Sequence, residues 1–229
     1  MVTTDEVYKM LLIDAYVGEK YTTRGHACRR VRHVDIAFTS TPLVCMRRTA
    51  WQSALQEFAW FLSGSTRVDD LPPSVRSWWS PWPDGTGYGR FTDELARGEF
   101  SIWDPSGALP PCAYTAFTCL EYRGDLHVSM MQRSCDLICG APHDWIQLWA
   151  YGLWLAEHRG MALGSVRWLC VDAHIYEAHS PVIEAIVEQR PQVSPELYYD
   201  ASAQEFRPSD FSLLKPYTPA LTMRAKLIV

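Results

Sequence analysis

The 229-residue sequence lacks any run of about 18 apolar residues, the length that a membrane-spanning helix needs. Its first six residues also lack the basic and apolar regions of a secretory signal peptide. Positive charge is not in excess, because the formal net charge is -5, so duplex nucleic acid is not an expected partner. We therefore expect a cytoplasmic protein that binds neither membranes nor nucleic acid.

Cysteine spacing of the kind found in metal sites is also missing. The seven cysteines are scattered, and Cys135 and Cys139 have no second pair nearby. An odd number of thiols in a cytoplasmic protein favours reduced side chains. We expect no disulfide framework, no bound metal, and at most one cysteine with special chemistry.

The hydrophobic pattern indicates one domain, residues 1–229, because a hydrophobic share of 48% over this length supports a sizeable core. Apolar spacing predicts helices near residues 1–17, 49–63, 145–158 and 180–188. Alternation and short apolar runs predict strands near residues 34–38, 114–122, 125–131, 166–171 and 194–199. The basic stretch 18–32 is most simply a solvated loop. The expected fold class is mixed α/β.

The segment from Gln132 to Asp144 has the densest group of chemically active side chains. Arg133 and Ser134 suit a phosphate, because guanidinium and hydroxyl groups make charge-assisted hydrogen bonds to its oxygens. Asp136 and Asp144 then flank a turn that contains glycine. Taken alone, the segment is most simply a strand–loop–helix junction with Asp144 as the helix cap.

Three further blocks change that interpretation: Gln56–Leu62, Leu109–Cys112 and Asp172–Tyr176. Together with the Gln132–Asp144 segment, they resemble the thymidylate synthase family in order and approximate spacing, from about residue 42 to the C-terminus. The resemblance implies a mixed β-sheet packed with helices, a homodimer formed sheet to sheet, and 5,10-methylenetetrahydrofolate as co-substrate. It also implies that the family's small variable domain is largely deleted here.

The resemblance implies four catalytic residues: Cys112, Glu57, Tyr88 and Asp144. Cys112 is the expected nucleophile, and Arg133 beside it is expected to lower the pKa of its thiol. Glu57 organises water and protons around the pyrimidine, and its place in an apolar helical run requires solvating partners or a raised pKa. Tyr88 lies near the reacting base, and Asp144 pairs with that base.

The same resemblance implies two binding sites. An early arginine reaches the nucleotide phosphate; Arg24 is the candidate, with Arg29 and Lys20 as alternatives. Arg97 reaches the phosphate from the partner subunit, although Ala96 stands where the family has a second arginine. The full substrate-binding set is Arg24, Arg97, Gln132, Arg133, Ser134, Asp136, Asp144, His174 and Tyr176, of which the last two suit a sugar hydroxyl. The expected folate-binding residues are Arg47, Trp79, Trp82, Asp136, Gly140, His143 and Val229, the last at the end of a closing tail.

Position 144 departs from the family pattern. Thymidylate synthases have asparagine there, whose amide can donate to uracil O4 and accept from N3–H. An ionised aspartate cannot donate to O4, but it can accept from the N4–H of cytosine, and a site of paired polar groups rejects the mismatched base. The same exchange marks deoxycytidylate 5-hydroxymethylases, and the sequence resembles that branch. Ala113 and His143, in place of the usual histidine and aromatic residue, favour water addition as the last step.

Several alternatives stay open. Methylation of dCMP or dUMP at C5, with release of dihydrofolate, uses the same early steps, and CMP 5-hydroxymethylation in nucleoside antibiotic biosynthesis is another candidate. A non-catalytic nucleotide- or RNA-binding relative needs neither Cys112 nor Glu57, and a structural interaction protein does not account for Arg133. Viral DNA modification is the commonest setting of the hydroxymethylase branch, and a viral protein would act in the host's cytoplasm.

Overall fold

The computed structural model describes residues 2–82, 101, 112–201, 204–223 and 225–228. Its centre is a five-stranded mixed sheet with the strand order β1-β2-β5-β4-β3. Only β4 and β5 are parallel among the neighbouring pairs of this sheet. The strands are β1 (Glu19–Thr23), β2 (His26–Phe38), β3 (Ala116–Tyr122), β4 (Asp125–Asp136) and β5 (Ala162–Tyr176). The mixed α/β fold class is confirmed.

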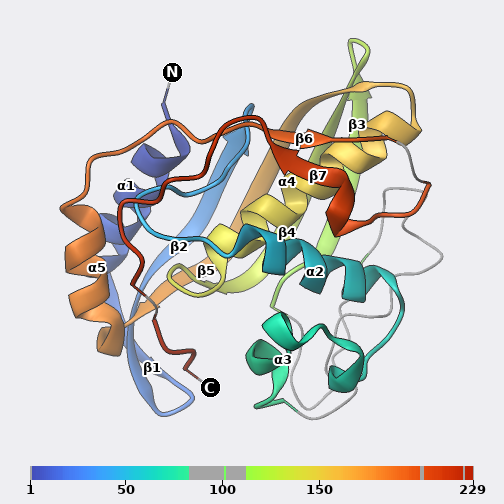
Figure 1. Cartoon of the computed structure of the whole chain (residues 1–229). Coiled ribbons are helices and arrows are strands. Elements are labelled where there is room, and N and C mark those ends of the chain that lie inside the picture. Colours follow the sequence, from blue (N-terminus) through green and yellow to red (C-terminus); the bar gives the residue numbers. More distant parts are fainter. Residues whose placement is uncertain (1, 83–100, 102–111, 202–203, 224, 229) are drawn as a thin grey trace.

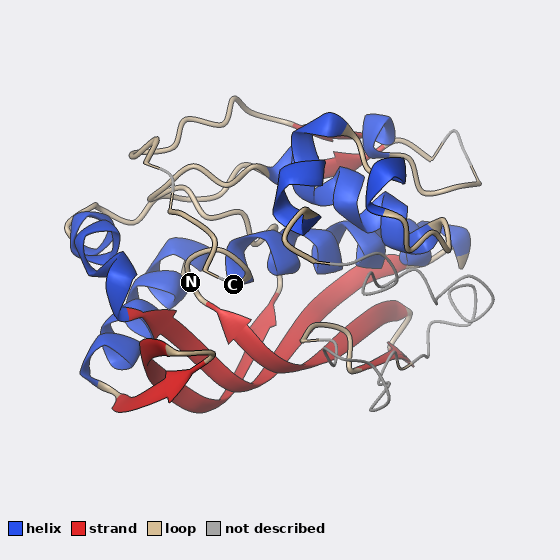
Figure 2. Ribbon diagram, turned by 90° about the horizontal axis from the view of Figure 1, so that it is seen from below, coloured by secondary structure: helices blue, strands red, loops and turns tan. Residues whose placement is uncertain are grey.

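The helices gather over one face of the sheet, as Figure 2 shows. They are α1 (Thr4–Val17), α2 (Trp51–Leu62), α3 (Pro73–Trp79), α4 (Ala141–His158) and α5 (Ser180–Val187). A two-stranded sheet of β6 (Leu197–Tyr199) and β7 (Phe211–Leu213) lies beyond α4 (Figure 1). Short 3-10 turns are η1 (Val68–Asp70), η3 (Glu177–His179) and η4 (Pro208–Asp210). No helix in the described ranges is both long and apolar enough to cross a bilayer.

The core lies between α4 and the sheet. Trp145 of α4 is fully buried, and its ring packs edge to face with Trp168 of β5 (5.4 Å between centroids) and Tyr8 of α1 (5.9 Å). Phe58 of α2 packs against Tyr151 of α4 at 5.4 Å. Because large aromatic rings lock these elements together, the ends of β4, β5 and α4 are held in fixed relative positions.

The basic stretch 18–32 is a β-hairpin, so the loop prediction is wrong. Thr23 pairs with His26, which leaves Arg24 and Gly25 as a two-residue turn. Their φ angles are 47° and 78°, the left-handed conformation that a type I′ hairpin turn requires at both positions. Alternation of apolar residues is weak here because both faces of β1 are partly exposed. The turn places Arg24 at the tip of the hairpin.

Other elements differ in their bounds. β4 and β5 run further than predicted and carry the residues from Gln132 to Asp136 and from Asp172 to Tyr176 on ladder positions. α4 begins at Ala141 with Gly140 as its cap, and Pro142 occupies its first turn, where proline is tolerated. Asp144 therefore lies inside the first turn of α4 and is not the cap. Helix α3 and strand β7 were not predicted.

Candidate active site

The two most distinctive sequence blocks lie side by side because β4 and β5 are parallel neighbours. Ser134 pairs with Asp172, and Asp136 pairs with His174, at the C-terminal ends of the two strands. Helix α4 starts directly after β4, and α2 packs against α4. Ligands commonly bind outside the carboxyl ends of parallel strands, and the predicted residues gather at this place.

Cys112 lies beside two arginines. Its carbonyl oxygen accepts a hydrogen bond from the backbone N–H of Arg133 at 2.9 Å, and Nη2 of Arg133 lies 3.3 Å from Cys112 Sγ. The side chain of Arg24 also hydrogen-bonds to the thiol, and its guanidinium lies over the Trp82 ring at 5.2 Å. Two cations therefore reach one sulfur atom.

The pKa of Cys112 is nevertheless raised above its ordinary value. Burial is the largest cause, since it disfavours the thiolate, while the charges of Arg133 and Arg24 lower the pKa and that of Asp144 raises it. The prediction of a lowered pKa is wrong because desolvation outweighs the arginine charges. In the free chain, the thiol is protonated at neutral pH.

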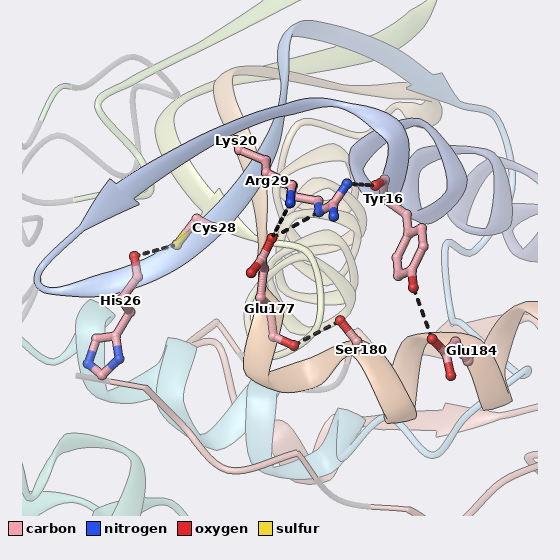
Figure 3. A network of polar contacts seen from close by, with 8 residues as sticks. All are labelled: Tyr16, Lys20, His26, Cys28, Arg29, Glu177, Ser180 and Glu184. Atoms are coloured by element: carbon pink, nitrogen blue, oxygen red, sulfur yellow. Dashed lines mark hydrogen bonds and ion pairs between the residues drawn. The ribbon is translucent and has the colours of Figure 1, made fainter.

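The alternatives to Arg24 point elsewhere. Figure 3 shows Arg29 and Lys20 directed at Glu177, with Nε of Arg29 at 3.2 Å and Nζ of Lys20 at 3.7 Å from the same carboxylate oxygen. Arg29 also donates to the carbonyl oxygen of Tyr16 at 2.7 Å. Of the three cations, Arg24 is the one with a hydrogen bond to Cys112, and its position favours it for the phosphate.

Asp144 is held by a chain of hydrogen bonds that begins in the core. The Nε1–H of Trp168 donates to Oε1 of Gln132 at 2.6 Å, and Nε2 of Gln132 donates to Oδ2 of Asp144 at 2.7 Å. The thiol of Cys135 donates to the same oxygen at 3.5 Å. Burial raises the pKa of Asp144 to about 6, against the lowering effect of Gln132 and Cys135.

Glu57 is buried in α2 with both oxygens occupied. Oε1 accepts from Nε1–H of Trp79 at 2.5 Å, and Oε2 accepts from Nε2 of Gln147 at 2.7 Å. Desolvation, with a smaller contribution from the charge of Asp144, raises the pKa of Glu57 to about 7, against the lowering effect of the hydrogen bonds from Trp79 and Gln147. Solvating partners and a raised pKa are both present, as expected for a carboxyl in an apolar run. A group with a pKa near neutrality suits proton transfer.

His143 is a neutral side chain. Its Nδ1–H donates to the carbonyl oxygen of Cys139 at 2.8 Å, because a carbonyl can only accept, and Nε2 accepts from the backbone N–H of Ala50 at 3.3 Å. Burial and the charge of Arg47 lower the pKa of His143 to about 4. The ring packs against Trp78 with 5.0 Å between centroids. Both nitrogens are used by the protein itself.

The predicted sugar-binding side chains form one cluster. Oγ of Ser134 lies 3.4 Å from Nδ1 of His174, and the His174 ring packs edge to face with Tyr176 at 5.3 Å. His174 and Tyr176 are both buried. The ring of Tyr21 in β1 also packs edge to face with His174, with 6.4 Å between centroids. Hydroxyl and imidazole groups in one place suit a sugar hydroxyl.

The predicted folate-binding residues near the start of α4 lie close together. Oδ1 of Asp136 accepts from the backbone N–H of Ile138 at 2.7 Å, while its buried Oδ2 has no partner among the described residues. A Cβ atom at Gly140 would lie 3.0 Å from the Asp136 carbonyl oxygen and 3.5 Å from Oδ2 of Asp144, so glycine allows this close approach. Arg47 is buried, and Nε of its side chain is also without a partner within the described ranges.

Two tryptophans predicted to stack on folate already have partners. Trp79 donates to Glu57, and its ring packs on Trp60 and Phe61. Trp82 carries the guanidinium of Arg24 on its ring. Three predicted site residues, Tyr88, Arg97 and Val229, lie outside the described residues. The described part of the tail, residues 204–223 and 225–228, returns to the site region through hydrogen bonds from Arg48 N to Leu221 O and from Ala220 N to Cys45 O.

Sequence reasoning missed two buried residues that act through their neighbours. Gln147 is fully buried in α4 and fixes Glu57, and Trp168 is fully buried in β5 and fixes Gln132. A glutamine within the apolar run of α4 is a usable signal, because a buried amide needs hydrogen-bond partners. The role of Trp168 has no such signal, since a tryptophan in a buried strand is ordinary core.

Comparison with known proteins agrees with this geometry. Residues 18–98 and 96–229 match the family described as thymidylate synthase. A relative named thymidylate synthase, from Rhodopseudomonas palustris (strain BisA53), is 23% identical over 259 aligned residues, which cover 85% of this chain and 87% of the relative. The structure of the thermostable thymidylate synthase A from Bacillus subtilis has the same fold, with a TM-score of 0.86 and 21% identity over 100% of this chain and 99% of that one.

Proposed function

Because the chain belongs to the thymidylate synthase family, which transfers a one-carbon unit from methylenetetrahydrofolate to a pyrimidine, we propose that it is a deoxycytidylate 5-hydroxymethylase. The reaction converts dCMP, methylenetetrahydrofolate and water into 5-hydroxymethyl-dCMP and tetrahydrofolate. The observation that carries this proposal is the oriented carboxylate of Asp144.

Asp144 offers the base an acceptor and no donor when it is ionised. The indole N–H of Trp168 can only donate, so Oε1 of Gln132 must face it, and the Gln132 NH2 group must face Asp144. Both the Gln132 and Cys135 bonds end on Oδ2, which leaves Oδ1 to accept from the N4–H of cytosine. Uracil presents O4 at that place, and two facing acceptors repel. The arrangement therefore favours cytosine.

The chemistry begins at Cys112. Loss of its thiol proton to solvent water gives the thiolate that adds to C6 of the pyrimidine, and Arg133 and Arg24 stabilise that negative charge. Carbon C5 becomes nucleophilic and forms a bond to the one-carbon unit. Loss of the C5 proton, with tetrahydrofolate as the leaving group, leaves an exocyclic methylene on the base. Glu57, with a pKa near 7, can accept and return a proton at neutral pH.

Water completes the reaction in this proposal. Addition of hydroxide to the exocyclic methylene, followed by loss of Cys112 from C6, gives the 5-hydroxymethyl group and frees the thiolate. His143 is neutral, and Ala113 stands where the family usually has histidine. Ala113 is buried and apolar, so it cannot make the hydrogen bonds that the usual imidazole would make beside the base. This difference supports water, rather than a hydride from the folate, as the final reactant.

Ligand and partner assignments follow the same family. Asp136 suits the folate, because its buried Oδ2 has no partner among the described side chains and can accept from an N–H of a pterin ring. Ser134, His174 and Tyr176 support a deoxyribonucleotide, so we propose dCMP over CMP. We propose a homodimer joined through the sheets, in which Arg97 of each subunit reaches the other subunit's phosphate.

Product analysis tests the proposal. Purified protein is incubated with methylenetetrahydrofolate and with dCMP, CMP or dUMP in separate reactions. Mass spectrometry gives the masses of the products, and absorbance reports the formation of dihydrofolate. We expect a dCMP product heavier by one CH2O unit and no dihydrofolate. Formation of methylated dCMP and dihydrofolate would show that the last step is hydride transfer and not water addition, and the role of Cys112 would be kept. Turnover of dUMP alone would overturn the role of Asp144.

A further inference from the structure

Three side chains with metal-binding atoms meet beside the proposed folate site. Asp136 is the last residue of β4, Cys139 lies in the turn that follows, and His179 lies in η3 after the end of β5. One ligand atom from each residue lies within 4.8 Å of the other two. The sequence spacing hides this cluster, because His179 is 40 positions from Cys139 and only the parallel pairing of β4 and β5 brings them together.

His179 is prepared to bind through Nδ1. Its side chain is 4% exposed, and Nε2 lies 2.8 Å from the carbonyl oxygen of Lys226, which can only accept. Nε2 therefore carries the proton, and Nδ1 carries a lone pair without a partner among the described residues. Metal-binding histidines usually donate their second N–H to a carbonyl or carboxylate in this way, which fixes the tautomer.

Asp136 and Cys139 complete a mixed set of oxygen, nitrogen and sulfur donors. Oδ2 of Asp136 is buried and without a hydrogen-bond partner in the described ranges, and the Cys139 sulfur lies close to this carboxylate. Burial and the charge of Asp136 raise the pKa of the Cys139 thiol, and Arg47 is the nearby cation whose charge opposes them. A carboxylate and a thiolate together carry two negative charges, so a divalent ion makes a neutral cluster beside Arg47.

We propose that Asp136, Cys139 and His179 form a binding site for Zn2+, with a fourth position open to water. Zinc accepts cysteine, histidine and aspartate ligands in tetrahedral sites with bonds of about 2.0–2.3 Å, and three protein ligands are typical of an open site. Such bonds place ligand atoms about 3.3–3.8 Å apart, so atoms that lie within 4.8 Å of one another need to approach by no more than about 1.5 Å on binding. The thiol proton of Cys139 is released to solvent as the metal binds.

Zinc at this site has a consequence for the proposed function. Asp136 cannot give Oδ2 to a metal and to the folate at the same time, so Zn2+ and methylenetetrahydrofolate exclude each other. His179 donates to the carbonyl oxygen of Lys226, so a metal that fixes His179 also holds the tail at Lys226. The site is therefore inhibitory, and this consequence rests on the proposed folate role of Asp136, while metal binding itself does not.

A cobalt titration of the full chain tests metal binding without nucleotide or folate. Four-coordinate Co2+ with one thiolate ligand gives visible ligand-field bands and a near-ultraviolet sulfur-to-cobalt band. We expect one Co2+ per chain, displaced by Zn2+. In Cys139→Ser the sulfur band disappears and the affinity for Zn2+ falls roughly 100-fold or more, beyond the 10–100-fold loss typical of an outer-shell change. His179→Gln keeps a donor for Lys226 but removes Nδ1, and we expect a similar loss.

Two thiol variants serve as controls. Cys112→Ser removes the proposed nucleophile, and Cys119→Ser removes a half-buried thiol of β3 outside the cluster. Both should keep the sulfur band, and thermal melting of every variant checks that it is folded. No band in the wild type, a band that survives Cys139→Ser, or a band lost only in Cys112→Ser would each overturn the site. If zinc binds at the cluster but does not compete with folate, the metal site is confirmed and its inhibitory role is overturned.

Discussion

The guanidinium of Arg133 lies 3.3 Å from the sulfur of Cys112, yet the pKa of this thiol is raised. The arginine charge favours the thiolate, and burial disfavours it more strongly. The free protein therefore keeps its proposed nucleophile protonated. Such a thiol resists oxidation and alkylation until a substrate is bound, because the thiolate is the reactive form.

Removal of the arginine charge should make Cys112 even less reactive. In Arg133→Ala we expect the pKa of Cys112 to rise by about one further unit, so its alkylation by iodoacetamide at pH 8 slows about tenfold. Peptide mass spectrometry measures the alkylation of Cys112 against pH. Arg123→Ala removes the same charge from an exposed turn and should behave like the wild type. Equal rates in wild type and Arg133→Ala would contradict the account.

Glu57 should make the folded state less stable as the pH rises. Its pKa is raised from an ordinary 4.5 to about 7 by burial, so the folded state binds the proton more tightly than the unfolded state does. The resulting stability is complete below about pH 4.5 and is lost as the pH rises through 7. In urea unfolding between pH 4.5 and 8, the stability of the wild type relative to Glu57→Gln should fall by about 3 kcal/mol.

Glu57→Gln also loses one hydrogen bond, from Trp79 or from Gln147. This loss does not depend on pH, so it does not affect the comparison of how the stability of each protein changes with pH. An exposed carboxyl supplies the control, because Glu121→Gln should change no slope. If the wild type and Glu57→Gln respond to pH in parallel, Glu57 does not titrate as described.

The sequence predicts the helices and most strands of this fold because their apolar patterns are strong, as in α2 and α4. It also predicts which residues gather at the site, since Arg133, Ser134 and His174 lie in distinctive blocks. It does not predict the β1–β2 hairpin, because that depends on the left-handed turn at Arg24. The sequence also does not predict that the pKa of Cys112 is raised, because burial depends on how the folded chain packs and not on the residues next to Cys112 in the sequence.

Asp144 should make base selection depend on pH. Its pKa of about 6 means that the carboxyl is ionised at pH 7 and protonated at pH 5. The protonated carboxyl can donate to uracil O4, while the ionised one accepts from cytosine N4–H. The ratio of kcat/KM for dCMP over dUMP should therefore fall by roughly 100-fold between pH 7 and pH 5. A constant ratio would contradict this role, because groups shared by both substrates cancel.

Trp168 should matter when residue 144 is an amide. With the Gln132 amide fixed by Trp168, an asparagine at 144 must turn its oxygen to Gln132 and its NH2 group to the base. Trp168→Phe in the Asp144→Asn background lets Gln132 flip, so both orientations occur and dCMP and dUMP react within about tenfold of each other. Trp149→Phe in the same background is the matched control, because this buried indole N–H has no partner among the described residues.

If the double variant Trp168→Phe, Asp144→Asn still selects strictly between dCMP and dUMP, Gln132 is fixed by something other than Trp168. The single Trp168→Phe variant should keep its preference for dCMP, because the carboxylate itself holds the Gln132 NH2 group. A KM and kcat measurement for each base separates this positioning effect from a general loss of structure, which would lower both activities together.

The most direct test of the central claim is the base preference of Asp144→Asn. The wild type and the variant compete dCMP against dUMP in one vessel with methylenetetrahydrofolate, and mass spectrometry gives the ratio of kcat/KM. The account predicts that the wild type uses dCMP and that Asp144→Asn shifts the ratio toward dUMP by about 1,000-fold, from two mispaired hydrogen bonds worth about 2 kcal/mol each. An unchanged ratio, or a wild type that prefers dUMP, would contradict it.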